Sequence, residues 1–253
     1  MRILTFFALL LLTPSYLYGK MPYDAVCVLN RANNGGGGSG TLVAKIDGKG
    51  LILTEAHVIP TVTQIEATWP TFKTTRIAKP VYVSYAYDTA LLVIDNPPCE
   101  PVSIATVINK DEVLYSTGFP WYSRDKLHWQ VGNLQKFEGF DAVITNRLAG
   151  GMSGGAVFNY RGSLAGTCKA LRGKDTTSII VTSQILIPIL MAYSDPETWR
   201  PVTNHLKDKK YFKSAEREKT NLTEPYSDET APNLQDNDPK TSNTIETKAP
   251  VKQ

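Results

Sequence analysis

The chain has 253 residues, of which 42% are hydrophobic and 20% are charged, and its formal net charge is only +3. This length and composition allow one or two domains with a sizeable buried core. The charge is small, the lysines are scattered and no basic run alternates with aromatic residues, so we do not expect a nucleic acid partner.

The N-terminal segment predicts export. Arg2 precedes an apolar run over residues 3–12, which Pro14 soon interrupts. The run is short for a membrane span and is typical of a secretory signal peptide, here residues 1–19. Leu17 is larger than the residue usually found near such a cleavage site, so an uncleaved N-terminal anchor, the one membrane contact we consider, stays open.

The first half of the chain predicts short strands. Apolar and β-branched segments alternate with glycine, asparagine and proline turn signals. The predicted strands cover residues 25–31, 41–46, 51–59, 64–69, 76–85 and 90–94. A proline-broken connection at residues 96–102 then separates the two halves of the chain.

The second half repeats this style. Its predicted strands cover residues 112–119, 128–137, 141–146, 155–160, 163–170 and 178–187. A helix is expected only from about Pro188, because proline suits the first turn of a helix. Residues 206–253 are rich in polar residues and proline and are predicted to be a disordered tail. Short, regularly spaced strands with few helical periods indicate an all-β barrel or sandwich.

Two pairs of glycines flank Ser153 in the segment LAGGMSGGAV, residues 148–157. Backbone without Cβ atoms makes tight turns and brings its N–H groups close to a ligand. A serine hydroxyl in such a turn can attack a carbonyl while the amides of Gly151 and Ser153 hold the resulting oxyanion. The alternative is a glycine-rich hairpin in which the serine is only a turn residue.

Two upstream residues have settings that suit the same chemistry. His57 ends an aliphatic run, and it is the most economical general base for Ser153, because His128 lies in a polar stretch and His205 lies close to the tail. Asp88 directly precedes an apolar strand, where partial burial requires a donor such as a histidine N–H. The alternative for Asp88 is a surface residue that starts a strand.

The order His57, Asp88, Ser153, with a histidine at a strand end and a GxSGG serine, resembles that of the trypsin-like serine proteases. The closest resemblance is to the high-temperature-requirement (HtrA) branch. Three segments carry it: residues 38–59 resemble its first hairpin, residues 141–167 its nucleophile region, and residues 185–188 its last strand running into a helix. No one of these motifs is specific alone.

This resemblance covers roughly residues 26–193 and implies an all-β fold of two six-stranded antiparallel barrels, with a short C-terminal helix. We expect the protease domain at residues 20–205, with barrel one at about 22–100 and barrel two at about 105–192. The active site would lie in the cleft between the barrels.

The resemblance also implies the roles of the site residues. Ser153 is the expected nucleophile, His57 the general base and Asp88 the group that orients the imidazole. The Gly151 and Ser153 amides form the expected oxyanion hole. The expected partner is a polypeptide substrate, and no cofactor is implied, because no cluster of residues has metal-ligand spacing.

Two residues depart from the trypsin pattern. Met152 stands where digestive relatives have an aspartate that pairs with a new N-terminus. The loop that carries the Gly151 and Ser153 amides, here called the oxyanion loop, must therefore be ordered in another way. Glu55 stands two residues before His57, where a small residue is commoner, and the simplest expectation is that its side chain points to solvent.

Specificity has two interpretations. By the resemblance, Arg147 lies at the floor of the primary pocket, and Lys169 and Leu171 lie along one wall. A cation at the floor would favour acidic substrate residues. If Arg147 instead points outward, an apolar pocket takes small aliphatic residues. The substrate is expected to lie as an added strand along residues 168–170.

The sequence therefore predicts an exported serine endopeptidase. A protease-like fold that has lost catalysis and serves as a secreted binding module is the main alternative. A third interpretation keeps the chemistry but uses a small ester or an acyl acceptor other than water.

Overall fold

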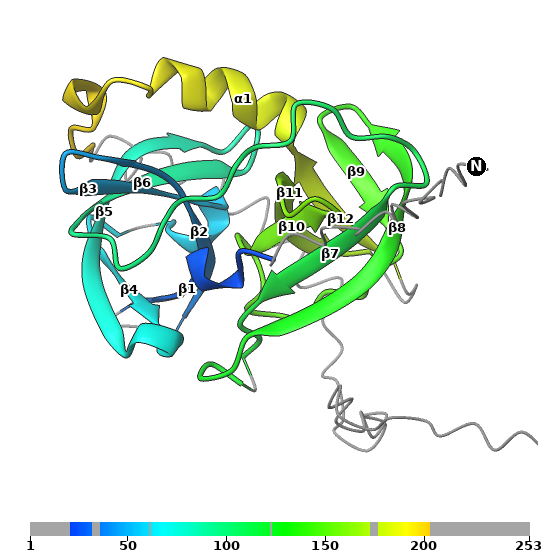
Figure 1. Ribbon diagram of the computed structural model, residues 1–253, viewed down its shortest axis with the longest axis horizontal. Coiled ribbons are helices and arrows are strands. Elements are labelled where there is room, and N and C mark those ends of the chain that lie inside the picture. Colours follow the sequence, from blue (N-terminus) through cyan, green and yellow to red (C-terminus); the bar gives the residue numbers. More distant parts are fainter. Residues whose placement is uncertain (1–20, 32–35, 61, 122, 173–176, 203–253) are drawn as a thin grey trace, which may run out of the picture.

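The computed structural model describes residues 21–202, apart from residues 32–35, 61, 122 and 173–176. Within this part of the chain, two closed barrels of six antiparallel strands each lie side by side, with one α-helix across them (Figure 1). The predicted all-β fold with two barrels is confirmed. The predicted signal peptide, residues 1–19, and the predicted tail, residues 206–253, lie outside the described residues.

The two barrels share one topology. Barrel one contains β1 (Val26–Asn30), β2 (Gly37–Ile46), β3 (Lys49–Thr54), β4 (Ile65–Trp69), β5 (Thr74–Ser84) and β6 (Thr89–Asp95), hydrogen-bonded in the order β1-β2-β3-β6-β5-β4. Barrel two contains β7 (Val113–Gly118), β8 (His128–Glu138), β9 (Asp141–Ile144), β10 (Ala156–Asn159), β11 (Leu164–Leu171) and β12 (Ser178–Thr182), in the equivalent order β7-β8-β9-β12-β11-β10. Closure of each sheet removes the exposed edges that an open sheet would leave.

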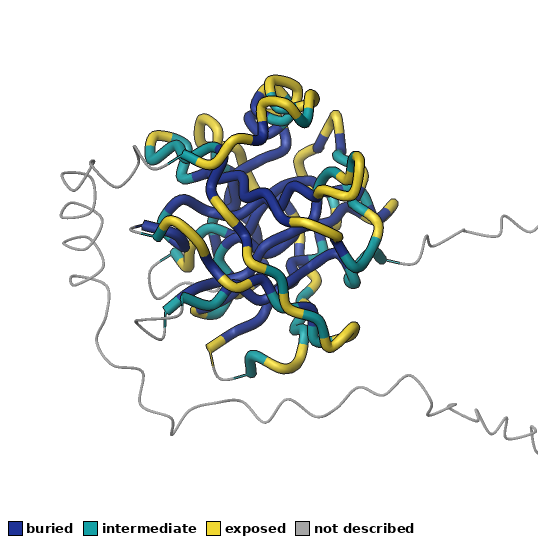
Figure 2. The backbone as a smooth tube through the Cα atoms, turned by 90° about the vertical axis from the view of Figure 1, so that its left-hand side faces the viewer, coloured by how far each residue is buried: buried dark blue, intermediate teal, exposed yellow. Residues whose placement is uncertain are grey.

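Aliphatic side chains fill both barrels. Leu29, Ile52 and Leu91 have no exposed surface in barrel one, and Leu134 and Ile180 have none in barrel two. Figure 2 shows the buried residues gathered in the middle of the molecule and the exposed residues mainly around its outside. The two cores give the loops between strands a rigid base, and the candidate site is built on these loops.

The helix α1 spans Ser183–Ala192, so the prediction that the last strand runs to residue 187 is wrong. Strand β12 ends at Thr182, and Pro188 lies inside the helix rather than at its start. Ile185, Leu186 and Ile189 are buried on one helical face, and α1 contacts β11 and β12. Packing of this face outweighs the backbone hydrogen bond that proline removes.

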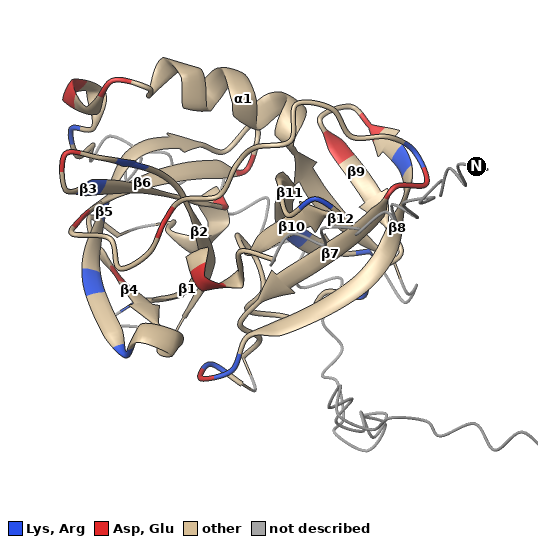
Figure 3. Cartoon of the chain, in the orientation of Figure 1, with Lys and Arg blue, Asp and Glu red and all other residues tan. Residues whose placement is uncertain are grey.

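Short 3₁₀ turns complete the described structure. They are η1 (Tyr23–Ala25), η2 (Ala56–Val58), η3 (Pro70–Phe72) and η4 (Pro196–Thr198). Charged residues of both signs are scattered along the two barrels (Figure 3). In the part of the chain that is described, no helix has the length and hydropathy needed to span a membrane.

Replacing Ile52 by alanine tests the packing of barrel one. The side chain is fully buried, so we expect Ile52→Ala to lower the free energy of unfolding by about 2–5 kcal/mol. The matched control is Ile77→Ala in β5, where 47% of the residue is exposed, and we expect a change within about 0.5 kcal/mol. Chemical denaturation measures both, and similar losses for the two variants would contradict the assigned core.

Candidate active site

Two paired strands bring His57 and Asp88 together. β3 and β6 pair along their length up to Thr54 and Ala90, so the residues just beyond this pair lie close to each other. His57 lies in η2, directly after β3, and Asp88 ends the turn before β6. The Asp88 backbone is left-handed, with φ of 50°, a conformation that aspartate tolerates in turns.

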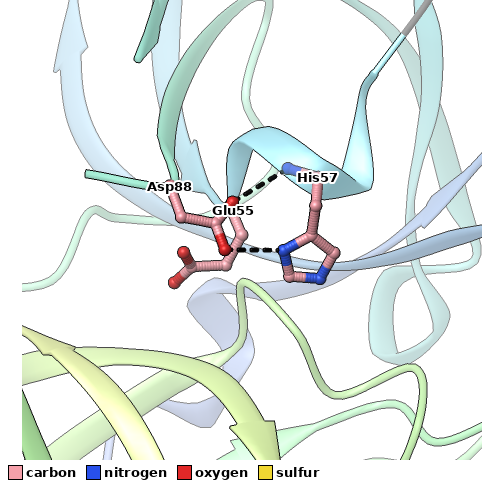
Figure 4. A group of neighbouring side chains, drawn as sticks. All are labelled: Glu55, His57 and Asp88. Atoms are coloured by element: carbon pink, nitrogen blue, oxygen red, sulfur yellow. Dashed lines mark hydrogen bonds and ion pairs between the residues drawn. The ribbon is translucent and has the colours of Figure 1, made fainter. Parts of the chain in front are cut away.

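The Asp88 carboxylate makes two hydrogen bonds to the same histidine (Figure 4). Its Oδ2 lies 2.9 Å from the ring Nδ1 of His57, and its Oδ1 accepts the His57 backbone N–H at 3.0 Å. Burial opposes ionisation of Asp88, but the hydrogen bonds and charge of His57 outweigh it and lower the pKa of the carboxyl below 3.8. With Nδ1 directed at Asp88, the other ring nitrogen is free to act on a proton.

The glycines around Ser153 fit places where side chains cannot. Gly151 and Gly154 have φ of +96° and +81°. A Cβ on Gly154 would lie 2.2 Å from the Thr54 hydroxyl oxygen, and one on Gly151 would lie 2.7 Å from the Phe119 carbonyl oxygen. The paired glycines therefore allow the Ser153 turn to press against both barrels.

Ser153 lies where the two barrels meet. It is half-buried, and its carbonyl accepts the Ser39 N–H of β2 at 2.7 Å. Its hydroxyl donates to the Lys169 carbonyl of β11 at 3.2 Å. Among the described residues no hydrogen bond joins Ser153 to His57. The structure thus brings His57 and Asp88 into direct contact, while Ser153 is turned toward β11.

The two predicted oxyanion amides are held by their neighbours. The Gly150 carbonyl, which shares a peptide with the Gly151 N–H, accepts the Trp121 N–H at 2.8 Å, and the Met152 carbonyl, which shares a peptide with the Ser153 N–H, accepts the Gly155 N–H at 2.8 Å. The Gly151 carbonyl between them accepts the Ser39 hydroxyl at 2.9 Å. Because a trans peptide points its C=O and N–H in opposite directions, the Gly151 N–H points away from Trp121. Within the described part of the chain, neither this N–H nor that of Ser153 has an acceptor.

Among the described residues, Met152 and Ser39 order the loop that carries the two predicted oxyanion amides. Met152 is 1% exposed, and its sulfur accepts the Ala149 N–H at 3.4 Å. The Ser39 hydroxyl, which binds Gly151, also accepts the Phe119 N–H at 2.9 Å. In the described part of the chain, apolar burial and side-chain hydrogen bonds thus order this loop, at the place where the trypsin pattern has an aspartate.

A single arginine connects the loop before β8 to barrel one, and the sequence analysis did not single it out. Arg124 donates to the carbonyls of Phe119 (2.9 Å), Leu29 (2.8 Å) and Gly38 (3.0 Å) and to Oδ1 of Asn30 (2.9 Å). Its guanidinium also lies 4.9 Å from the centre of the Trp121 ring. Arg124 thus braces the segment whose Trp121 N–H fixes the oxyanion loop. No local pattern marks such a residue, because its partners are mostly backbone carbonyls distant in sequence.

Glu55 is fully buried, so the expectation that it points to solvent is wrong. The Thr167 hydroxyl donates to its Oε1, while Oε2 is buried without a partner. Burial, together with the nearby charge of Asp88, raises the pKa of Glu55 well above 4.5. The Glu55 side chain is therefore part of the protein interior directly behind the His57–Asp88 pair.

Glu55, His57 and Asp88 each offer one atom within 4.8 Å of the others, a spacing that a metal ion could use. However, Oδ2 of Asp88 is already hydrogen-bonded to Nδ1 of His57, Oδ1 of Asp88 accepts the His57 backbone N–H, and Oε1 of Glu55 accepts the Thr167 hydroxyl. Among the described residues, Oε2 of Glu55 is the one carboxylate oxygen of this group without a partner. This donor set fits a hydrogen-bond network better than a metal centre.

The residues predicted to contact substrate differ in their surroundings. Lys169 pairs with Asp141 at 2.8 Å, and burial of its ammonium is outweighed by this ion pair, so its pKa is raised. Arg147 is exposed, and 43% of Leu171 is exposed. Lys169 therefore contacts Ser153 through its backbone carbonyl, while its charge is directed at β9.

Comparison with protein families gives a match to the trypsin-like peptidase domain over residues 38–166, slightly more than half of the chain. The matched segment contains His57, Asp88 and Ser153. The chain belongs to the trypsin-like peptidase family. Among curated proteins, no sequence matches this trypsin-like peptidase significantly.

Solved structures share the fold of this trypsin-like peptidase. The serine endoprotease from Yersinia pestis aligns with a TM-score of 0.60 and 20% identity, over 74% of this chain and 64% of that chain. The HtrA-type protease AlgW with a decapeptide aligns with a TM-score of 0.58 and 17% identity, over 68% of this chain and 65% of that chain. The trypsin-like peptidase thus spans just under two thirds of either structure's chain.

Replacing Arg124 by alanine tests the brace on the oxyanion loop. We expect the free energy of unfolding to fall by about 1–3 kcal/mol, because several partly buried carbonyls lose their donor. Amide hydrogen exchange should accelerate at Trp121 and at Met152, whose N–H groups are hydrogen-bonded to the carbonyls of Gly150 and Ala149. The control Arg161→Ala removes a guanidinium that lies 5.1 Å from the Tyr160 ring on the exposed β10–β11 turn, and it should leave this exchange unchanged. Equal exchange in both variants would contradict the brace.

Proposed function

We propose that the protein is an exported serine endopeptidase that uses His57, Asp88 and Ser153 as a catalytic triad. The observation that carries the proposal is the pair of hydrogen bonds from His57 to Asp88. An imidazole held in this way by an ionised carboxylate is a general base with a fixed tautomer. Ser153 lies at the junction of the barrels, beside two amides that have no acceptor among the described residues, and is the nucleophile that such a base would serve.

Acylation begins when the Ser153 hydroxyl leaves the Lys169 carbonyl by rotation of its side chain and turns to the free ring nitrogen of His57. His57 takes the hydroxyl proton as the oxygen attacks the substrate carbonyl carbon. The Gly151 and Ser153 amides bind the resulting oxyanion. His57 then gives the proton to the leaving amine as the C–N bond breaks, which leaves an ester between substrate and Ser153.

Deacylation repeats these steps with water. His57 removes a proton from the water molecule, which attacks the ester carbonyl, and the same two amides bind the second oxyanion. Collapse returns the proton to Ser153 and releases the carboxylic acid product. Asp88 keeps its charge throughout and stabilises the imidazolium form of His57.

A peptide substrate fits along β11. This strand pairs with β12 as far as Leu171, but its pairing with β10 ends at Thr167. Residues 169–171 thus keep one edge for an extended peptide, which would add a strand next to Ser153. The AlgW structure, which has the same fold, was determined with a decapeptide, and this supports a peptide as the substrate class.

We extend the proposal to the whole chain. Residues 20–205 form the peptidase domain, with barrel one at about residues 22–100 and barrel two at about residues 105–192. The apolar N-terminal segment, residues 1–19, directs export, so we expect activity in a secreted or periplasmic fraction.

A secreted binding module without catalysis is the second candidate. The hydrogen bond from Ser153 to the Lys169 carbonyl, in place of one to His57, is the observation that favours it. In that case the hydroxyl would stay where it is and would not react. Covalent labelling separates the two functions.

Reaction with a fluorophosphonate probe tests the triad. Ser153 should attack phosphorus and displace fluoride, with His57 taking the hydroxyl proton. We expect rapid labelling of the wild type and none of Ser153→Ala or His57→Ala. Asp88→Asn should label about 10⁴-fold more slowly, because His57 is then held in the wrong tautomer.

Two variants control for general effects on the fold. Ser163→Ala and His128→Ala replace residues of the same types on barrel two and should label like the wild type. A folded wild-type protein that never labels would contradict the endopeptidase and leave the binding module.

A peptide library tests specificity. Because Arg147 is exposed, we expect cleavage after small aliphatic residues, without a preference for Glu or Asp. Arg147→Gln should change kcat/KM by less than about fivefold for any peptide, since an exposed charge contributes at most about 1 kcal/mol. A strong preference for acidic residues that Arg147→Gln abolishes would show instead that Arg147 forms the pocket floor.

A further inference from the structure

A buried side-chain hydrogen bond joins the two barrels directly behind the candidate triad. Thr167 of β11 donates to Glu55, a residue 112 positions earlier in the chain that precedes η2 of barrel one. Thr167 is 1% exposed and Glu55 is not exposed at all. Water therefore cannot replace this contact, and breaking it would leave polar atoms buried without partners.

The bond connects the segments that carry the two halves of the site. Glu55 lies two residues before His57. On the other side, Thr167 lies two residues before Lys169, whose carbonyl accepts the Ser153 hydroxyl. Cys168, which lies between Thr167 and Lys169, accepts the Gly154 N–H at 2.8 Å and donates its own N–H to the Gly155 carbonyl at 2.9 Å. A shift of Glu55 relative to Thr167 would therefore move His57 relative to Ser153.

The surroundings of Glu55 favour its neutral form. Its carboxylate has an oxygen within 4.8 Å of an Asp88 oxygen (Figure 4), and two carboxylates this close in the interior do not both ionise easily. Asp88 has two donors from His57, whereas Glu55 has only the Thr167 hydroxyl and one oxygen with no partner. Asp88 therefore keeps the negative charge.

The remaining groups around Glu55 do not reverse this assignment. The titratable side chains that face it from the neighbouring elements are His57, Asp88, Cys168, Lys169 and Asp141. The Cys168 thiol is buried and its pKa is raised, so it stays neutral. Lys169 is the one cation with a fixed charge in this group, and its ammonium is already paired with Asp141.

We propose that Glu55 is a positioning residue: as a neutral carboxylic acid bound to Thr167, it holds the His57–Asp88 pair of barrel one in register with Ser153 of barrel two. The neutral form matters because a second negative charge beside Asp88 would compete for His57. This inference rests on the proposed function, since the register of the two barrels affects a rate only if the triad is catalytic.

Four substitutions test the proposal, with the rate of fluorophosphonate labelling at Ser153 as the readout. Thr167→Val removes the hydroxyl and keeps the shape, and we expect labelling to slow by about 10- to 100-fold, the effect of a small misplacement of reacting groups. Thr167→Ser restores the hydroxyl and should recover most of the rate. Glu55→Gln keeps the acceptor oxygen and should do the same, whereas Glu55→Ala should be as slow as Thr167→Val.

The pH dependence of labelling separates positioning from charge. If Glu55 is neutral, Glu55→Gln leaves the acid limb of the pH–rate profile where it is in the wild type. If Glu55 were ionised, its removal would take a negative charge away from His57 and move that limb to lower pH. Such a shift, or wild-type labelling by a folded Thr167→Val protein, would overturn the proposal.

Thermal unfolding tests the neutral form without any catalysis. A folded-state pKa above the ordinary glutamate value of 4.5 means that the native protein binds more protons than the unfolded chain above that pH. The wild type should therefore lose stability relative to Glu55→Gln as the pH rises from about 4.5. A constant or opposite difference would overturn the proposal even if the wild type never labelled, an outcome that by itself would contradict only the endopeptidase.

Discussion

Ser39 is a fully buried serine of barrel one that hydrogen-bonds to Gly151 and Ser153 in the oxyanion loop and to Phe119 in the neighbouring segment. Its N–H binds the Ser153 carbonyl, its hydroxyl binds the Gly151 carbonyl and accepts the Phe119 N–H, and its own carbonyl accepts the Thr54 hydroxyl. Each of these groups is removed from water, so all of them must be satisfied at once. This constraint fixes the Ser153 turn against the strands that lead to His57.

The contacts between the barrels form a layered arrangement around the site. On one side of the site, Ser39 and Arg124 make the hydrogen bonds that order the amides next to Ser153. On the other side, the hydrogen bond between Glu55 and Thr167 joins the segments that carry His57 and Ser153. The two carboxyl groups near the imidazole differ because their donors differ, and unlike environments of this kind assign unlike protonation states to similar side chains. Each barrel folds around its own aliphatic core, while these buried polar contacts set how the two barrels meet.

The strand pattern of the sequence predicted the fold well because apolar segments and turn signals are local features. The end of barrel two was harder to predict. The apolar pattern from Ser178 to Ile187 is continuous, and only packing decides that β12 ends at Thr182 and a helix follows. The resemblance of residues 38–59 to a protease hairpin pointed to a functional segment but could not show what Ser39 binds. Side chains that reach across the molecule leave no periodic signal in the sequence.

Local features of the sequence likewise indicated some residues of the candidate site and not others. The sequence indicated His57, Asp88 and Ser153 through local settings, and the structure brings the first two within hydrogen-bonding distance. Glu55 was expected at the surface, because a single glutamate before a histidine gives no sign of burial. Its one hydrogen-bond donor among the described residues, Thr167, is distant in sequence. The sequence did not indicate Arg124 either, because most of its hydrogen-bond partners are also distant in sequence. Residues that position others depend on tertiary contacts, so they become visible only in the structure.

A crystal structure of the protein phosphonylated at Ser153 would test the central claim most directly, because the adduct imitates the tetrahedral intermediate. The account predicts a phosphonyl oxygen about 2.7–3.1 Å from both the Gly151 and the Ser153 amide nitrogens, with the His57 ring next to the modified Ser153 oxygen and its hydrogen bond to Asp88 kept. An adduct whose oxygen points to solvent, with neither amide in contact and His57 turned away, would contradict it.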